Sequence, residues 1–240
     1  MMNPTAAMLV IGDEILSGRT RDSNLHYLAG EVTKAGIALT EARIVADDHE
    51  TIVRAVNDLR HQYDHVFTSG GIGPTHDDIT ADAIAAAFGV QITHRADAMA
   101  LLSAHYARSG IVLNEARQRM ARIPDGAVLI DNPVSAAPGF SLKNVHVMAG
   151  VPNIFQAMLA SVLPTLIGGA PLLSQSLRLM RGEGDIAGPF GAVAAQFPEL
   201  SMGSYPFNVN GAMGTNLVVR GTDARQIDAA MIRLAALFVA

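Results

Sequence analysis

Short apolar runs alternate with longer amphipathic segments along the first two-thirds of the chain. Residues 6–11 form a continuous apolar run of strand length, which is typical of a strand buried on both faces of a sheet. Strands are also predicted over residues 39–45, 66–69, 127–130 and 145–149. The separation of these runs by longer segments indicates that helices connect the strands.

The connecting segments carry helix start and stop signals. Asn24 is expected to cap a helix that ends near Gly36, and Thr80 is expected to cap a helix over residues 81–88. The acidic segment 47–50 opens another helix, where the helix dipole favours negative charge. Further helices are predicted over residues 96–109, 115–122 and 153–166. This rhythm predicts an α/β fold of three layers, α/β/α, around a mostly parallel sheet.

The last third of the chain follows a different order of elements. Residues 167–171 contain two glycines and a proline and are expected to form a linker. One strand, one helix, two strands and a closing helix are predicted over residues 175–180, 186–196, 200–205 and 215–220 and from residue 224. We therefore predict an α/β domain over residues 5–168 and a small α+β appendix over residues 172–240.

Composition narrows the class of protein. Of the 240 residues, 50% are hydrophobic and 16% are charged, which is the profile of a globular protein with a substantial core. The formal net charge is −5 and no run rich in Lys or Arg occurs, so no nucleic-acid partner is expected. The chain contains no cysteine, which excludes disulfides and thiol catalysis. With no signal-peptide pattern and no apolar stretch of about 18 residues, we expect a cytoplasmic protein without membrane segments.

The strongest chemical signal is a glycine-rich segment after the third predicted strand. Residues 69–75 read Ser-Gly-Gly-Ile-Gly-Pro-Thr. The glycines at positions 70, 71 and 73 let the backbone turn its N–H groups into a nest for phosphate oxygens, close to a helix start. We predict phosphate contacts from the segment's polar and glycine residues, which are Ser69, Gly70, Gly71, Gly73 and Thr75. The alternative is a tight turn in which Asp78 and Thr80 only cap the next helix.

Carboxylates surround this segment in the predicted fold. Asp77 and Asp78 follow it directly, and Asp47 follows the second predicted strand. Acids beside a phosphate nest repel the ligand unless a divalent cation such as Mg²⁺ lies between them. The first strand ends in a further group of candidate ligand-binding residues, which are Gly12, Asp13 and Glu14. In an open parallel sheet all these positions lie at the carboxyl ends of strands, where ligands bind.

Three familiar catalytic signatures do not occur. The sequence has no Gly-x-x-x-x-Gly-Lys-Ser/Thr segment, which argues against a P-loop NTPase. The segment around Gly71 and Gly73 does not continue to a third glycine at the dinucleotide-binding spacing, and no serine has a Gly-x-Ser-x-Gly setting. The glycine-rich segment therefore needs another explanation.

With these residues in view, the chain resembles the molybdopterin-binding domain family. The matching motifs recur in order at residues 12–15, 17–18, 22–24, 69–75 and 77–80, within a resemblance that covers about residues 5–168. The form Gly-Gly-Ile-Gly-Pro-Thr followed by paired aspartates is similar to one branch of the family. That branch contains the N-terminal domain of competence/damage-inducible protein A and a domain of eukaryotic FAD synthases.

The resemblance implies a three-layer α/β fold that binds molybdopterin or an adenylylated nucleotide. Members transfer AMP to molybdopterin, or hydrolyse the pyrophosphate of ADP-ribose or FAD, with a divalent metal. It implies that Asp78 is the metal-associated acid and that Asp13, Glu14 and Asp47 line the pocket. We predict Asp78 and Asp47 as metal ligands, and both together with Asp77 as catalytic residues. Matches to the family's other ligand-side loops fall on Pro138, Gly139, Gly150 and Pro152. The implied cofactors are Mg²⁺ or a similar ion, with molybdopterin as an alternative ligand.

Three positions depart from the family pattern. Ser135 stands where a glycine is usual, Ala149 where a proline is usual, and Ile154 where an acid is usual. These departures favour the alternative of a non-catalytic module that binds molybdopterin or a nucleotide. The high apolar content, together with the behaviour of relatives, predicts a homo-oligomer, either a dimer or a trimer.

Overall fold

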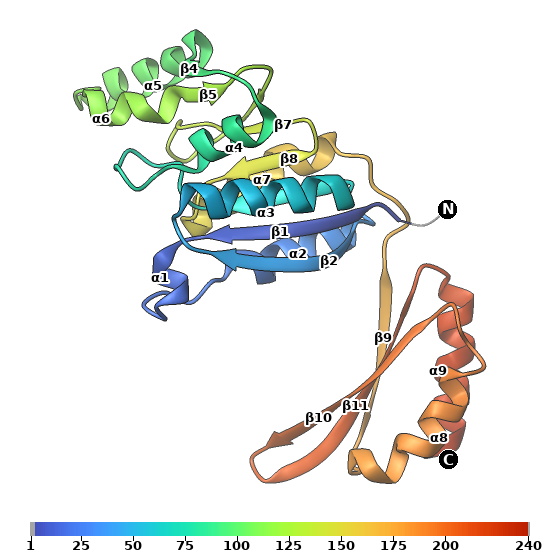
Figure 1. Cartoon of the computed structure of the whole chain (residues 1–240). Coiled ribbons are helices and arrows are strands. Elements are labelled where there is room, and N and C mark those ends of the chain that lie inside the picture. Colours follow the sequence, from blue (N-terminus) through green and yellow to red (C-terminus); the bar gives the residue numbers. More distant parts are fainter. Residues whose placement is uncertain (1–2, 240) are drawn as a thin grey trace. The chain divides into compact units, whose positions relative to one another are not determined.

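The computed structural model describes residues 3–239, in which the chain forms two compact units that divide between Gly169 and Ala170 (Figure 1). The first unit contains a six-stranded sheet in the order β2-β1-β3-β8-β7-β6. The first four of these strands are parallel, and the last two run antiparallel to their neighbours. The strands are β1 (Thr5–Ile11), β2 (Ala38–Val45), β3 (His65–Ser69), β6 (Val128–Ile130), β7 (Gly139–Leu142) and β8 (Val145–Met148). The predicted α/β fold with a mostly parallel sheet is confirmed.

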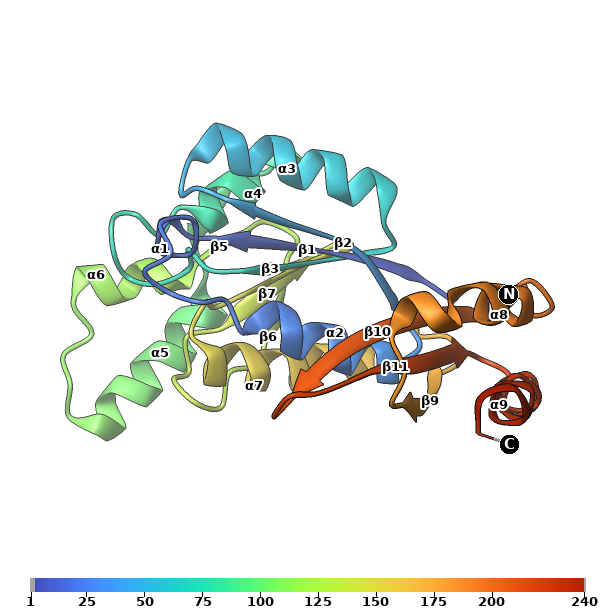
Figure 2. The ribbon, with the colours of Figure 1, turned by 90° about the horizontal axis from the view of Figure 1, so that it is seen from below.

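Helices cover both faces of this sheet (Figure 2). Successive side chains of a strand point to opposite faces, so Leu9 lies in the same core as α3 and α4, while Met8 lies in the core with α2 and α7. All residues of β1 after Thr5 are buried, as the continuous apolar run predicted. The longer helices are α2 (Asn24–Lys34), α3 (His49–Gln62), α4 (Thr80–Phe88), α5 (Ala96–Ser109) and α7 (Pro152–Val162), and the shorter are α1 (Asp13–Leu16) and α6 (Glu115–Gln118).

One predicted helix is wrong in part. Residues 115–122 do not form one helix, because α6 is followed by a 3-10 turn, Arg119–Ala121, and then by strand β5 (Arg122–Pro124). β5 pairs with β4 (Ile92–His94) in a separate two-stranded sheet. The physical reason is Pro124, which cannot continue a helix and favours an extended conformation in the residue before it. Strand β7 was also not predicted, because it is short and polar Ser141 interrupts its apolar pattern.

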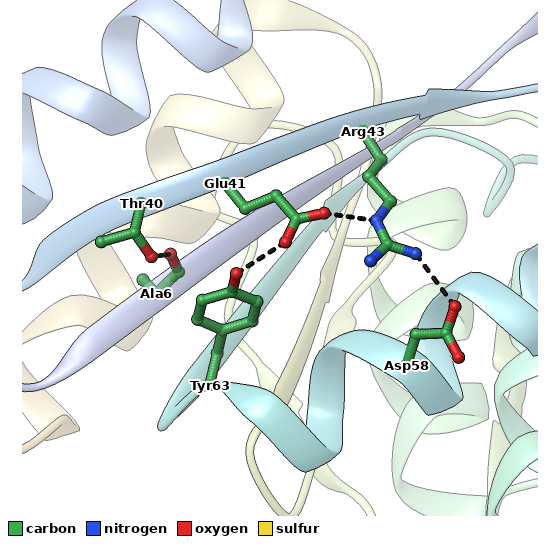
Figure 3. Close-up of polar contacts among 6 residues, drawn as sticks. All are labelled: Ala6, Thr40, Glu41, Arg43, Asp58 and Tyr63. Atoms are coloured by element: carbon green, nitrogen blue, oxygen red, sulfur yellow. Dashed lines mark hydrogen bonds and ion pairs between the residues drawn. The ribbon is translucent and has the colours of Figure 1, made fainter.

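A polar network ties the edge strand β2 to the residues that end α3 (Figure 3). The hydroxyl of Tyr63 donates to Glu41 at 2.6 Å, and Arg43 donates to both Glu41 and Asp58. The bonds from Tyr63 and Arg43 hold the pKa of Glu41 below its ordinary value. Charged side chains on an edge strand discourage pairing with other chains, and here they also fix the strand that leads to Asp47.

The second unit is an antiparallel three-stranded sheet packed against two helices. The strand order is β10-β11-β9, and buried side chains of both helices share one core with Leu179, Leu217 and Val219. Its elements are β9 (Leu173–Leu179), α8 (Glu183–Ala194), β10 (Ser201–Val209), β11 (Ala212–Gly221) and α9 (Ala224–Phe238). Among the described residues of the whole chain, no helix is long and apolar enough to cross a membrane.

Candidate functional site

A cleft of about 520 Å³ lies at the carboxyl ends of the parallel strands. The loops that follow β1, β2, β3 and β8 all contribute to its lining. Most of the residues predicted from the sequence line this one cleft, and they are Gly12, Glu14, Asp47, Gly70, Gly71, Gly73, Asp77, Asp78, Gly150 and Pro152. The cleft therefore brings together segments that are more than a hundred residues apart in the sequence.

The glycine loop, residues 70–73, needs its glycines for steric reasons. Gly70 and Gly71 have φ angles of +109° and +66°. A Cβ atom on Gly70 would lie 2.1 Å from the carbonyl oxygen of Ile11, and one on Gly71 would lie 2.1 Å from Oγ1 of Thr80. These distances are far below van der Waals contact, so neither position accepts a side chain without a shift of the backbone or of Thr80.

Thr80 holds the glycine loop rather than capping α4, which corrects the sequence-based expectation. It is the first residue of α4, after Ile79 as the N-cap residue. Its hydroxyl donates to the carbonyl of Gly70 at 3.0 Å, and its backbone N–H donates to the carbonyl of Gly71 at 2.9 Å. With both carbonyls engaged, the loop is fixed from the side of the helix.

Three successive backbone N–H groups of the glycine loop remain available. The amide of Gly70 donates to Met148 at 3.1 Å, whereas those of Gly71, Ile72 and Gly73 donate to no atom within residues 3–239. Backbone N–H groups without an internal acceptor, next to a helix start, are the elements of an anion-binding nest.

The cleft is acidic and has no basic side chain among its described lining residues. Asp13 and Asp47 face each other: the N–H of Asp13 donates to Asp47 at 2.9 Å, and the N–H of Asp47 donates to Asp13 at 3.4 Å. Burial raises the pKa of Asp47 above its ordinary value, and the charges of Asp13, Glu14 and Asp77 act in the same direction. Asp13 does not line the cleft, and its two hydrogen bonds hold Asp47 in position.

Asp78 is partly engaged inside its own loop. Its Oδ2 accepts a hydrogen bond from the N–H of Thr75 at 2.8 Å and another from the Thr75 hydroxyl. Thr75 therefore positions Asp78 and does not line the cleft. Within residues 3–239 no group of three or more His, Asp or Glu side chains is close enough to hold a metal ion by itself. A divalent ion in this cleft would need oxygen ligands from another source.

Asn24 connects three segments of the site, and the expectation that it caps α2 is wrong. Its Nδ2 donates to Ser69 Oγ and to the carbonyl of Gly150, both at 2.7 Å. The capping bond comes instead from Asp22, whose Oδ2 accepts from the N–H of Leu25 at 2.9 Å. Ser69 is buried and lies outside the cleft lining. Its contact with Asn24 is therefore structural and links α2 to the residue that precedes the glycine loop.

The asparagine loop, residues 132–139, forms another part of the cleft. Asn132 donates to Ser135 Oγ and to the carbonyl of Ala137, and it accepts from the N–H groups of Val134 and Ser135. The left-handed residue of this loop is Ala136, with φ +60°. Ser135, at the usual glycine position, turns its hydroxyl to Asn132 and lines the cleft.

Pro138 and Gly139 lie outside the cleft lining. Pro138 lines a smaller neighbouring hollow. Gly139 begins β7, where a Cβ atom would lie 2.5 Å from the carbonyl oxygen of Val147. The glycine at this position is therefore explained by close packing of adjacent strands.

Several apolar side chains also line the cleft, and the sequence analysis did not identify them as binding residues. They come from the end of β1, the loops after β3 and β8, the 3-10 turn and α7, and they include Ile11, Ile72, Met120, Ala149, Val151, Ile154 and Met158. Apolar side chains that follow Gly150 at the end of a strand were the available signal. The cleft thus combines free amides and carboxylates with apolar side chains, a mixture that is typical of small-molecule sites.

Comparisons with known proteins agree with this architecture. Residues 7–168 match the family model described as "Probable molybdopterin binding domain", and residues 171–240 match "FAD synthase, middle domain". A protein of Pyrobaculum calidifontis is 33% identical over 212 residues, which cover 85% of this chain and 81% of that protein. A CinA-like protein of Geobacter sp. (strain M21) is 35% identical over 205 residues, which cover 83% of this chain but only 48% of the relative.

A solved structure supports the same assignment. The crystal structure of the protein CinA with unknown function from Thermoplasma acidophilum is 32% identical, with a TM-score of 0.62, and the match covers 68% of this chain and 97% of that one. The family match over residues 7–168 covers more than half of the chain. The chain therefore belongs to the molybdopterin-binding domain family, in its CinA-like branch.

Proposed function

We propose that the cleft binds an adenylylated or molybdopterin-type ligand and catalyses a metal-dependent reaction at its pyrophosphate. The reaction is hydrolysis of an ADP-ribose-like or FAD-like substrate, or transfer of its adenylyl group. One observation carries the proposal: three free amides of the glycine loop, four carboxylates and several apolar side chains line the same cleft. The apolar side chains would contact the ring of the ligand, and the amides would bind its phosphates.

The donor set fits a divalent ion that arrives with the ligand. Mg²⁺ keeps several waters and uses one or two carboxylates together with substrate phosphates, so a three-residue protein cage is not needed. Asp47 and Asp78 would hold it, and Asp78 keeps Oδ1 for this purpose. Burial is the main cause of the raised pKa of Asp47, and the charges of Asp13, Glu14 and Asp77 add to it. A bound cation would offset those charges. When bound, the ion supplies charge neutralisation at the phosphates and activation of a water molecule.

The chain's own residues supply orientation. The amides of Gly71, Ile72 and Gly73 would donate to the phosphate oxygens and to the charge that develops on them. In hydrolysis a water oxygen forms a bond to one phosphorus atom of the pyrophosphate, and the bond from that phosphorus to the bridging oxygen breaks. ADP-ribose then yields AMP and ribose phosphate, and an ionised carboxylate of the cleft, with Asp77 as the exposed candidate, accepts the proton of the water.

The test is a screen of purified full chain with ADP-ribose and FAD, each with Mg²⁺, Mn²⁺ or Co²⁺, with release of AMP as the readout. The proposal predicts AMP release that is lost in Asp78→Asn. Asp125→Asn is a matched control, because Asp125 lies outside the cleft lining. Intact substrate with every metal after overnight incubation, also for adenylylated molybdopterin, would rule out the catalytic proposal.

A second candidate function is a non-catalytic binding module. Ile154 favours it, because this residue places an apolar side chain in the cleft where the family pattern has an acid. Tight binding of ADP-ribose or molybdopterin without turnover, unchanged by Asp78→Asn, would support this alternative over the first.

A further inference from the structure

The proposed phosphate site has an unexplained electrostatic feature. Its described cleft lining contains four carboxylates, from Glu14, Asp47, Asp77 and Asp78, but no Lys, Arg or His. Free backbone amides alone offer partial positive charge. A phosphorylated ligand would be held more firmly if a cationic side chain lay within reach of the glycine loop.

A small hollow beside the cleft contains such side chains. It shares Gly71, Ile72, Gly73 and Asp78 with the cleft, and Arg119 and Arg122 also line it. Arg122 is already neutralised, because its two terminal nitrogens donate to the two carboxylate oxygens of Asp82 at 2.8 and 2.5 Å. Arg119 is the other basic residue of the hollow.

The side chain of Arg119 has no hydrogen-bond or ion-pair partner within residues 3–239. Its Nε is buried without a hydrogen-bond acceptor, and its guanidinium makes no ion pair with any described carboxylate. An unpaired buried donor is costly in a folded protein. Arg119 begins the 3-10 turn that replaces the end of the predicted helix, and it lines the same hollow as Gly71 and Gly73 of the glycine loop.

The size of the hollow limits what can reach Arg119 through it. Its volume of about 20 Å³ admits one group of the size of an oxygen atom or a water molecule. A guanidinium presents five N–H donors in a planar fork that matches phosphate oxygens. A phosphate oxygen seated on the amides of the glycine loop is a group of the right size and charge.

We propose that Arg119 is a phosphate-binding residue of this site, which donates to an oxygen of the ligand's phosphate held on the glycine loop. This inference rests on the proposed function. It identifies Arg119 as the cationic side chain that the described cleft lining lacks. Arg119 would also offset the negative charge of Asp78, which lines the same hollow.

The test compares ADP and adenosine as probes, by calorimetric titration of the full chain with Mg²⁺ present. Arg119→Ala should weaken ADP binding about tenfold or more, as for loss of a charge-assisted phosphate contact, and should leave adenosine binding unchanged. Arg119→Lys should recover part of the loss, because an ammonium keeps the charge without the fork. Arg117→Ala is the matched control, since Arg117 lies just before the same turn and donates to the carbonyl of Val112 at 2.7 Å.

The outcomes separate this inference from the proposed function. Wild-type protein that binds ADP, with Arg119→Ala binding it equally well, would overturn the role of Arg119 alone. Equal losses for ADP and adenosine would also overturn it, because they indicate a structural role. Wild-type protein that binds neither ADP nor ADP-ribose would refute the proposed function and this inference with it. If Arg119→Ala does not fold, Arg119→Gln keeps most of the side-chain volume and is judged by the same comparison.

Discussion

The glycine loop and the asparagine loop both line the cleft, yet they are held in opposite ways. In the glycine loop, positive φ angles fall on Gly70 and Gly71, and nearby atoms leave no room for a Cβ. In the asparagine loop, the positive φ angle falls on Ala136, and the side chain of Asn132 holds the turn through four hydrogen bonds.

The two loops therefore differ in which backbone groups are used to hold their conformation. In the glycine loop, Thr80 binds two backbone carbonyls, and three backbone amides have no acceptor within residues 3–239. In the asparagine loop, the amides of Val134 and Ser135 donate to the side chain of Asn132, so they are not available to a ligand. This contrast supports the proposal that the glycine loop, and not the asparagine loop, binds the phosphates of the ligand.

The largest effect is expected from Gly70→Ala. The new Cβ would meet the backbone oxygen of Ile11 at 2.1 Å, in a conformation with φ +109°. We expect a loss of about 3 kcal/mol or more in the free energy of unfolding, measured with urea, together with loss of nucleotide binding. Gly89→Ala is the control, with φ +64° but no atom within 4 Å, and should cost about 1 kcal/mol. Equal losses in the two variants would contradict the steric account.

A smaller loss is expected from Asn132→Ala. This side chain is only 4% exposed, and its removal leaves partly buried N–H and carbonyl groups of the asparagine loop without their partners. The expected cost is about 2 to 3 kcal/mol in urea unfolding. Asn114→Ala provides the comparison, because Asn114 accepts one capping bond from Arg117 and should cost about 1 kcal/mol. A cost no greater than that of the control would show that Asn132 does not organise its loop.

Ala136→Gly should act in the opposite direction to Gly70→Ala. Removal of the Cβ relieves the left-handed conformation at φ +60°, although glycine loses more entropy on folding. The net result should be a gain of up to about 1 kcal/mol in the free energy of unfolding. The neighbouring Ala137→Gly has no positive φ to relieve and should destabilise the protein. Destabilisation in both variants would contradict the strain assigned to Ala136.

The smallest effect is expected from Asp47→Asn, and it depends on pH. Because the pKa of Asp47 is raised in the folded state, the folded protein binds its proton more tightly than the unfolded chain does. The protein therefore loses stability as pH rises from the ordinary range of an aspartate through the raised value. Asparagine keeps an acceptor for the N–H of Asp13. We expect the variant to equal the wild type in acid and to exceed it at neutral pH, by under about 1 kcal/mol.

Urea unfolding across this pH range checks that prediction. A variant that is less stable than the wild type at neutral pH would contradict the prediction, because it would mean that the folded protein stabilises the ionised form of Asp47. Addition of Mg²⁺ with ADP should reduce the difference between the variant and the wild type, because the bound ion favours the ionised form of Asp47.

Much of the fold could be predicted from the sequence because its signals are local. The buried strand β1 is a continuous apolar run, and Gly36 ends α2 with φ +70°. One failure has a non-local cause. The antiparallel pair β4 and β5 depends on contacts between segments about thirty residues apart, and propensity within residues 115–122 could not reveal that pairing.

The site was predicted unevenly for a similar reason. The steric need for Gly70 and Gly71 follows from backbone geometry that glycine-rich segments indicate. The roles of Asn24 and Thr80 were predicted wrongly, because each resembles a helix cap in sequence while its partner lies in another segment. Arg119 has no motif that distinguishes it from other arginines, and only the three-dimensional arrangement brings it to the glycine loop.

The most direct test of the central claim is a crystal structure of the full chain with Mn²⁺ and an α,β-methylene analogue of ADP-ribose. The account predicts diphosphate density within hydrogen-bond distance of the amides of Gly71, Ile72 and Gly73, and anomalous manganese density near Asp47. The ring should lie against Ile154 and Met158. A ligand bound away from the glycine loop, or a cleft without ligand and metal at saturating concentrations, would contradict it.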